Sequence, residues 1–412
     1  MALVLFLSLF VLLFIGMPVA IALGLSSAVA VWSASDIPLI ILAQREFTSI
    51  DSFPLMAIPF FVLAGTLMEY GGISKRLINF ANKMTGHITG GLGLVVVVTS
   101  MFFSAISGSG AATVAALGSI LIPAMIQRGY HRNYAGALQA VSGELGIIIP
   151  PSIPMILYAV STGTSIRDMF IAGVIPGLLI GGSLMIMVVI VAKKRGYPSE
   201  QKASAAERWQ AFKEAILALI MPIIVLGGIY GGIFTPTEAG AVAVFYAFIV
   251  GVLIYREINL NILMKILKES TIVSAIVLFI IANAGLFGWI LSREGVPHAI
   301  ASYFATLSES PIVFLLIVNV LLFLVGLFFD VGAAIIILGP ILAPVAAGFN
   351  IDPVHFGIIM IINLALGLCT PPVGVNLFIS CQIAGIKLGD ISRAIIPFLA
   401  IVVVDLLLIT FL

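Results

Sequence analysis

Long apolar runs dominate the sequence and set the strongest limit on its fold. Stretches of about 20 residues, such as 215–233 and 391–411, carry few or no charged side chains. A helix of about 20 apolar residues spans a bilayer, whereas a membrane β-barrel needs short strands of alternating hydropathy. The 412 residues are 61% hydrophobic and only 9% charged, against about a quarter charged residues in soluble domains. The sequence therefore predicts an all-α polytopic membrane protein embedded in a lipid bilayer.

The distribution of basic residues predicts the orientation. When the apolar runs are placed across the bilayer with the N-terminus outside, 16 of the 19 basic residues fall on one side, leaving Arg45, Arg167 and Arg293 on the other. The positive-inside rule makes the crowded side cytoplasmic, so both termini are expected in the periplasm. The first basic residue is Arg45. We therefore expect the apolar N-terminus to be a retained span, because a signal peptide begins with basic residues.

The net charge and the absence of certain sequence motifs disfavour several classes of function. A net charge of +1 argues against a nucleic-acid partner. Cys369 and Cys381 lie in apolar runs and are expected to be free thiols, and the four histidines are scattered. The apolar runs contain no nucleophile–base pair and no metal-ligand cluster, so we do not expect an enzyme. We expect no bound metal ion other than Na⁺.

An internal repeat organises the chain. Shifted by 221 residues, positions 109–160 overlay 330–381 without a gap, with eleven of 52 positions identical and Pro150-Pro151 falling on Pro371-Pro372. Each copy, 1–192 and 215–412, is expected to have five crossings and one re-entrant hairpin, and a cytoplasmic linker, 193–214, joins them. An odd number of crossings inverts the second copy.

The repeat contains two kinds of break in the membrane. Hairpins are expected at 91–127 and 311–348, with tips "SGSG" and "FFDVG", and broken helices at 133–163 and 353–382. Irregular backbone at membrane depth persists only where it is buried in protein or lines a cavity. Inverted repeats with facing breaks are typical of secondary transporters, which bind ions and substrate there. Full double crossings in place of the hairpins would leave the sidedness of the charges unchanged.

The breaks offer two kinds of binding group. Freed carbonyl oxygens suit a hard cation such as Na⁺, and helix N-termini suit an anion such as a carboxylate. Each polar residue there also has a structural interpretation. The "SGSG" tip is suited to close helix contact, Asp330 to capping a helix, and Thr370 and Asn376 to hydrogen bonds between helices. For Glu144, a proton relay, a cation ligand and a structural hydrogen bond all stay open. Glu238 is expected to be a charge at a helix N-terminus.

Four segments resemble the large membrane subunit of the tripartite ATP-independent periplasmic (TRAP) transporters: "SGSGAATVAALGSILIPAM", "LGIIIPPSIPMILYA", "FTPTEAGAVAV" and "GLCTPPVGVNLF". The resemblance covers nearly the whole chain. It implies an elevator-type transporter of the ion transporter superfamily in the cytoplasmic (inner) membrane of a bacterium or archaeon. It also implies Na⁺-driven import of a small organic acid, such as a C4-dicarboxylate, sialic acid or another sugar acid. The implied partners are a small membrane subunit and a periplasmic substrate-binding protein.

The resemblance also implies site residues. Its two cation sites correspond here to Ser107, Ser109, Gly146 and Pro150, and to Asp330, Gly367 and Thr370. We expect the substrate to contact Gly108, Gly110, Pro151, Ser152, Pro372, Gly374 and Asn376. Glu144 has no role that the resemblance assigns. The alternative function is a self-sufficient Na⁺/organic anion symporter of the same architecture.

Overall fold

The computed structural model describes residues 1–307 and 310–412, and the side chains of all residues except 304–309. All regular elements within these described residues are helices. Eight of the described helices are long and apolar enough to cross a membrane. The number rises to nine if Arg132–Ile148 and Ile153–Thr162, which meet at a bend of 42°, form one broken span. The predicted all-α polytopic fold is confirmed.

The first half of the chain forms eleven α-helices and one 3₁₀-helix: α1 (Ala2–Phe14), α2 (Val19–Ala34), α3 (Ile40–Ile50), η1 (Phe53–Met56), α4 (Ala57–Tyr70), α5 (Ile73–Thr85), α6 (Gly91–Ser107), α7 (Gly110–Gln127), α8 (Arg132–Gly143), α9 (Leu145–Ile148), α10 (Ile153–Thr162) and α11 (Ile166–Arg195). The second half forms α12 (Ala205–Tyr230), α13 (Pro236–Phe248), the π-helix η2 (Ile249–Ile254), α14 (Leu260–Arg293), α15 (Val296–Leu307), α16 (Pro311–Gly326), α17 (Val331–Gly348), α18 (Pro353–Leu368), α19 (Val375–Ala384) and α20 (Leu388–Phe411).

The helix starts repeat with the spacing found in the sequence. Helices α7 and α17 begin 221 residues apart, as do α8 and α18. The residues before α7 and α17, Ser109 and Asp330, both cap their helix by accepting hydrogen bonds from backbone N–H groups. The pairs α6–α7 and α16–α17 occupy the residues expected for the two hairpins. Their re-entrance and the inverted relation of the two copies remain predictions.

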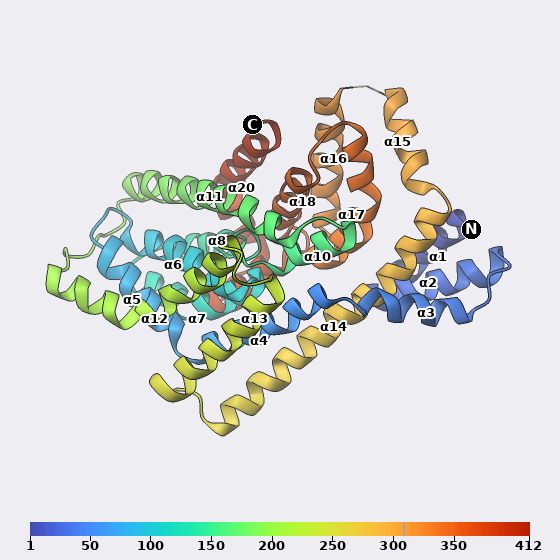
Figure 1. Ribbon diagram of the computed structural model, residues 1–412. Coiled ribbons are helices and arrows are strands. Elements are labelled where there is room, and N and C mark those ends of the chain that lie inside the picture. Colours follow the sequence, from blue (N-terminus) through green and yellow to red (C-terminus); the bar gives the residue numbers. More distant parts are fainter. Residues whose placement is uncertain (308–309) are drawn as a thin grey trace.

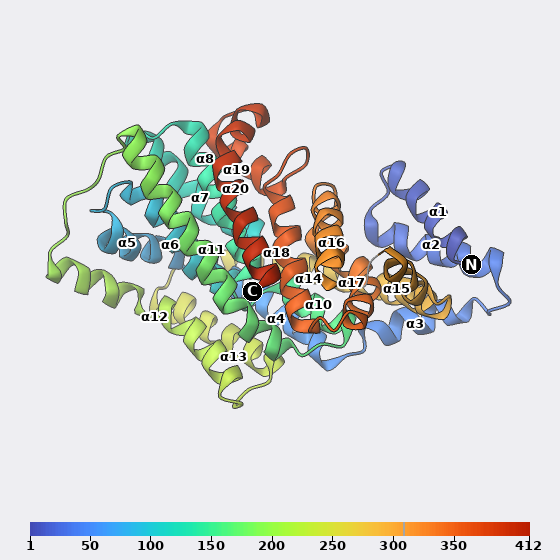
Figure 2. The same ribbon diagram turned by 90° about the horizontal axis from the view of Figure 1, so that it is seen from above.

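The long helix α14 crosses the molecule diagonally and packs against α2, α3, α4 and α17 (Figure 1). Near its C-terminal end lie α1 and α15, whereas α5 and α12 lie at the opposite end of the molecule, as Figure 2 also shows. Helices α6–α11 and α16–α20 form the packed body between these ends. One face of α14 thereby borders the helix breaks.

Two parts of the chain differ from the sequence-based assignment. Residues 40–50 were not assigned to a helix, but they form α3, which packs against α14. The expected linker 193–214 is largely helical, because α11 continues to Arg195 and α12 already begins at Ala205. Ser204 and Glu207 form a capping box that starts α12. A second capping box, Thr235 with Glu238, starts α13, so the expectation for Glu238 is confirmed.

Candidate functional site

The first hairpin tip packs tightly on the first broken helix. A Cβ atom on Gly146 would lie 2.5 Å from the Ser109 carbonyl oxygen, and one on Gly108 would lie 3.0 Å from the Pro151 carbonyl oxygen. Gly108 adopts the left-handed conformation, with φ +61°, which glycine reaches without strain. Its carbonyl oxygen accepts a hydrogen bond of 3.4 Å from Ile153 N. Glycine at 108 and 146 therefore permits direct backbone contact between the tip and the break.

Several oxygen atoms converge where this tip meets α9. The Ser107 hydroxyl lies 3.1 Å from the Thr113 hydroxyl, which donates a 2.8 Å hydrogen bond to the Ser109 carbonyl oxygen. Ser107 and Thr113 are buried. Hydroxyl and carbonyl oxygens of this kind fit a hard cation, so the predicted group Ser107, Ser109 and Gly146 is brought together. Thr113 was missed, although its position one turn after Ser109 is visible in "SGSGAAT".

The second tip is arranged differently. Gly367, the counterpart of Gly146, contacts the backbone of Gly326 so closely that a Cβ atom would overlap the Gly326 carbonyl group. Asp330 is exposed, and its Oδ1 accepts a hydrogen bond of 2.9 Å from Gly332 N. Thr370 Oγ1 donates a 2.7 Å hydrogen bond to the Leu366 carbonyl oxygen. The backbone partner of Gly367 is thus Gly326, at the end of α16, which sequence reasoning missed.

Four helices begin at one cavity of about 220 Å³ between the two tips, which we call the tip cavity. Its lining includes the first residues of α7, α10, α17 and α19, namely Gly110, Ala111, Ile153, Pro154, Val331, Gly332 and Val375. The start of a helix carries a partial positive charge of about half a unit. No Lys or Arg occurs among the described residues that line the cavity, and the one charged lining residue is Asp330. Among these lining residues, only the helix ends supply positive potential, and the Asp330 carboxylate opposes it at the start of α17.

The predicted substrate residues occupy different places around this cavity. Gly108 and Gly110 line it, together with Ser109 and Asp330 from the predicted cation sites. Pro150, Pro151 and Ser152 are buried in the first break, and the Ser152 hydroxyl donates a 2.6 Å hydrogen bond to the Ile147 carbonyl oxygen. In the second break Pro372 is exposed, Gly374 precedes α19 with φ +43°, and Asn376 is buried. The Asn376 amide donates to the Ala140 carbonyl oxygen at 3.3 Å, on α8.

Glu144 lies between α8 and α9 and is completely buried. Neither of its carboxyl oxygens has a hydrogen-bond partner in the described part of the chain. The neighbouring Cys369 thiol donates to the Ala140 carbonyl oxygen at 3.0 Å. The proton-relay, cation-ligand and hydrogen-bond interpretations of Glu144 remain predictions.

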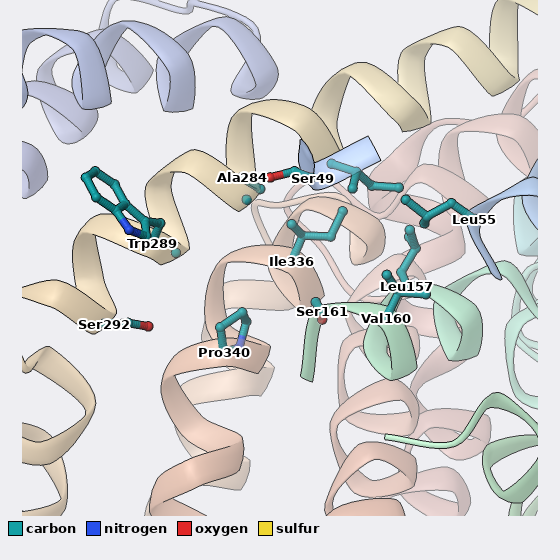
Figure 3. A pocket seen from close by; sticks show the side chains of 13 residues that line it. Ser49, Leu55, Leu157, Val160, Ser161, Ala284, Trp289, Ser292, Ile336 and Pro340 are labelled. Carbon is teal, nitrogen blue, oxygen red and sulfur yellow. The ribbon is translucent and has the colours of Figure 1, made fainter. Parts of the chain in front are cut away.

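A second cavity, of about 360 Å³, adjoins the first along α14, and we call it the Trp289 cavity (Figure 3). Trp289 and Ser292 reach it from α14, Ser161 from α10 and Pro340 from α17. Leu157 and Ile336 line both cavities. The Arg45 and Arg293 guanidinium groups lie 4.9 and 5.8 Å from the centre of the Trp289 ring.

The fold is that of a polytopic membrane transporter. It is similar to the YdaH transporter of Alcanivorax borkumensis, with a TM-score of 0.65 at 16% identity, covering 90% of this chain and 86% of that one. It is equally similar to MtrF of Neisseria gonorrhoeae, with a TM-score of 0.65 at 13% identity over 95% of this chain and 92% of that one. At these identities the likeness concerns the fold alone.

The family follows from the sequence comparison. Residues 6–412 match the model of the tripartite ATP-independent periplasmic transporter, DctM component, and the chain belongs to this family. It is 45% identical to the C4-dicarboxylate TRAP transporter large permease protein DctM of Pseudomonas aeruginosa over 95% of this chain and 91% of the relative. It is 42% identical to the sialic acid TRAP transporter large permease protein SiaM of Vibrio cholerae, over 94% of this chain and 91% of the relative.

A third relative is longer than this chain. The isethionate TRAP transporter permease protein DctMQ of Oleidesulfovibrio alaskensis is 46% identical over 97% of this chain. The chain spans 63% of the length of that relative. The chain therefore corresponds to part of this DctMQ protein.

Proposed function

We propose that the chain is the large membrane subunit of a Na⁺-coupled importer of a small organic anion. The convergence of four helix N-termini on the tip cavity carries the proposal. Oriented backbone N–H groups bind an anion without the desolvation that a buried Lys or Arg would require. A site built this way accepts a carboxylate or a sulfonate and leaves selection among such acids to other contacts.

The names of the relatives support an organic anion but do not select one. Relatives at 46%, 45% and 42% identity are named for isethionate, C4-dicarboxylates and sialic acid. Another, at 39%, is named for 2,3-diketo-L-gulonate. All of these ligands carry an acidic group, whereas their sizes and hydroxyl patterns differ. These relatives are similarly identical to this chain, so the shared acidic group is the ligand feature that we propose the site binds.

Na⁺ coupling is supported by the oxygen atoms at the first tip. In our proposal Ser107, Ser109, Thr113 and Gly146, with Pro150 beside them, hold one cation, and Asp330, Gly367 and Thr370, with Gly326 beside them, hold a second. A cation at either place lies next to a helix break that borders the tip cavity. Binding it adds positive charge beside the anion, so that each favours the binding of the other.

We further propose a tripartite assembly in the cytoplasmic (inner) membrane of a prokaryote, with both termini in the periplasm. The family name, which describes a tripartite transporter with a DctM component, supports partner proteins, and a small membrane subunit is one of them in our proposal. In the assembly a periplasmic substrate-binding protein delivers the acid. Transport then follows an elevator-type movement of the hairpins and broken helices past α14.

Uptake into proteoliposomes tests this proposal. The large and small subunits are reconstituted together, and labelled succinate, sialic acid and isethionate are each offered with the periplasmic binding protein. We expect one of the three acids to accumulate only when the binding protein and an inward Na⁺ gradient are both present. Full uptake with choline in place of Na⁺ contradicts the coupling. Full uptake without the binding protein favours the self-sufficient symporter instead.

A further inference from the structure

A third cavity, with both apolar and cationic walls, lies far from the tip cavity, where α5 packs against α12. We call it the arm pocket, and its volume is about 620 Å³. Its lining consists of Phe80, Met84, Lys202, Ala203, Ala205, Arg208, Trp209 and Phe212. Figure 1 places α5 and α12 at the end of the molecule opposite to α1 and α15.

Arg208 brings two buried guanidinium N–H groups to the arm pocket. Its Nε and Nη2 atoms are buried and have no hydrogen-bond partner among the described residues. The nearby acids bind other cations instead: Glu207 pairs with Lys83 at 2.9 Å, and Glu200 pairs with Arg128 at 2.7 Å. Buried polar atoms in native proteins are usually hydrogen-bonded, and a buried donor without an acceptor costs free energy. The two buried N–H groups of Arg208 are therefore suited to binding an anion at the arm pocket.

The apolar wall of the pocket is suited to a lipid. Trp209 stacks on Phe212 with ring centres 5.5 Å apart, and Phe212 packs against Phe80 at 6.0 Å. Trp209 and Met84 nevertheless stay 58% and 43% exposed. The same helix, α12, continues from here into an apolar span. Tryptophan beside basic residues at the end of such a span is typical of the membrane interface.

We propose that the arm pocket binds the phosphate headgroup of an anionic phospholipid. Arg208 donates to the phosphate oxygens, Lys202 adds a second positive charge, and the glycerol backbone and first acyl carbons lie along Trp209 and Met84. On the predicted orientation this pocket faces the cytoplasmic leaflet, where sixteen basic residues gather. Bound lipid would hold α5 against α12 and so brace one end of the molecule.

Lipid binding to the purified full chain tests the proposal. The melting temperature is measured in detergent with added phosphatidylglycerol, phosphatidylcholine or inorganic phosphate, and bound lipid is counted by native mass spectrometry. We expect phosphatidylglycerol alone to raise the melting temperature and to remain bound. Arg208→Gln should weaken its binding about fivefold, the effect of removing one basic residue near a membrane surface.

Matched variants make the result specific. Lys193→Gln removes an exposed cation at the end of α11 and should leave binding unchanged. Arg208→Lys keeps the charge and should retain most of the binding, which separates charge loss from misfolding. Equal binding of phosphatidylglycerol by the Arg208→Gln and unsubstituted proteins overturns the proposal. So does an equal effect of phosphatidylcholine, or a full effect of inorganic phosphate alone.

Discussion

The contact between Gly146 and the first hairpin tip provides the sharpest test of the cation site. In Gly146→Ala the new Cβ would lie 2.5 Å from the Ser109 carbonyl oxygen and 2.8 Å from the Thr113 hydroxyl. Ordinary contact begins at 3.4 Å, so the tip must retreat from α9 by about 0.9 Å. Protein oxygens hold hard cations such as Ca²⁺ at about 2.3–2.6 Å. A displacement of this size therefore disrupts the proposed Na⁺ site.

The energetic balance also favours a loss of binding. Alanine improves helix propensity by up to about 1 kcal/mol, but overpacking against backbone atoms costs about 1–3 kcal/mol. If about 1.4 kcal/mol of that cost falls on the Na⁺-bound state, the Na⁺ concentration for half-maximal uptake rises about tenfold. Proteoliposome uptake at graded Na⁺ concentrations measures this value.

Gly182→Ala is the matched control. Gly182 lies inside helix α11 with no atom within 4 Å of its Cβ position, so the same substitution should leave the Na⁺ requirement unchanged. An unchanged Na⁺ requirement in a well-folded Gly146→Ala protein would refute the placement of the cation between Ser109 and Gly146.

Substitutions at three further positions test the site and its support. Ser109→Ala should raise the Na⁺ concentration needed for half-maximal uptake; an unchanged value leaves the "SGSG" tip with a packing role. Asp330→Ala should weaken Na⁺ dependence more than protein abundance and should lose about 1 kcal/mol of helix capping. Asp330→Asn retains the cap, so normal Na⁺ dependence in that variant assigns Asp330 to capping alone. Asn363→Leu removes the amide that donates to the Oδ1 atom of the buried Asn319 at 2.6 Å. The free energy of unfolding, measured by thermal unfolding, should fall by about 1–3 kcal/mol. An unchanged melting temperature contradicts this prediction.

The sequence was most informative where chemistry and spacing coincide. The capping interpretation of Asp330 is confirmed, and helices end and begin at both expected tips, because glycine, proline and capping residues interrupt apolar runs at defined positions. The family was also identified correctly from four short segments. Local signals of this kind do not depend on how distant helices pack.

The sequence was less informative where the packing of helices determines which residues come into contact. The close contact of Gly367 with the Gly326 backbone was not predicted; it forms because two glycines allow two backbones to meet. For Asn376, the interhelical hydrogen bond is present, to the Ala140 carbonyl oxygen on α8, and its contact with the substrate stays a prediction. Which side of a short helix faces a cavity depends on the rotation of that helix, and single-sequence patterns within an apolar segment do not fix this rotation.

The tip cavity and the Trp289 cavity share part of their wall. Leu157 and Ile336, from α10 and α17, line both spaces. The volume and rotamers of these two side chains therefore help to keep the spaces apart. Smaller residues at positions 157 and 336 would widen any connection between the two cavities, and an aromatic side chain there would narrow it.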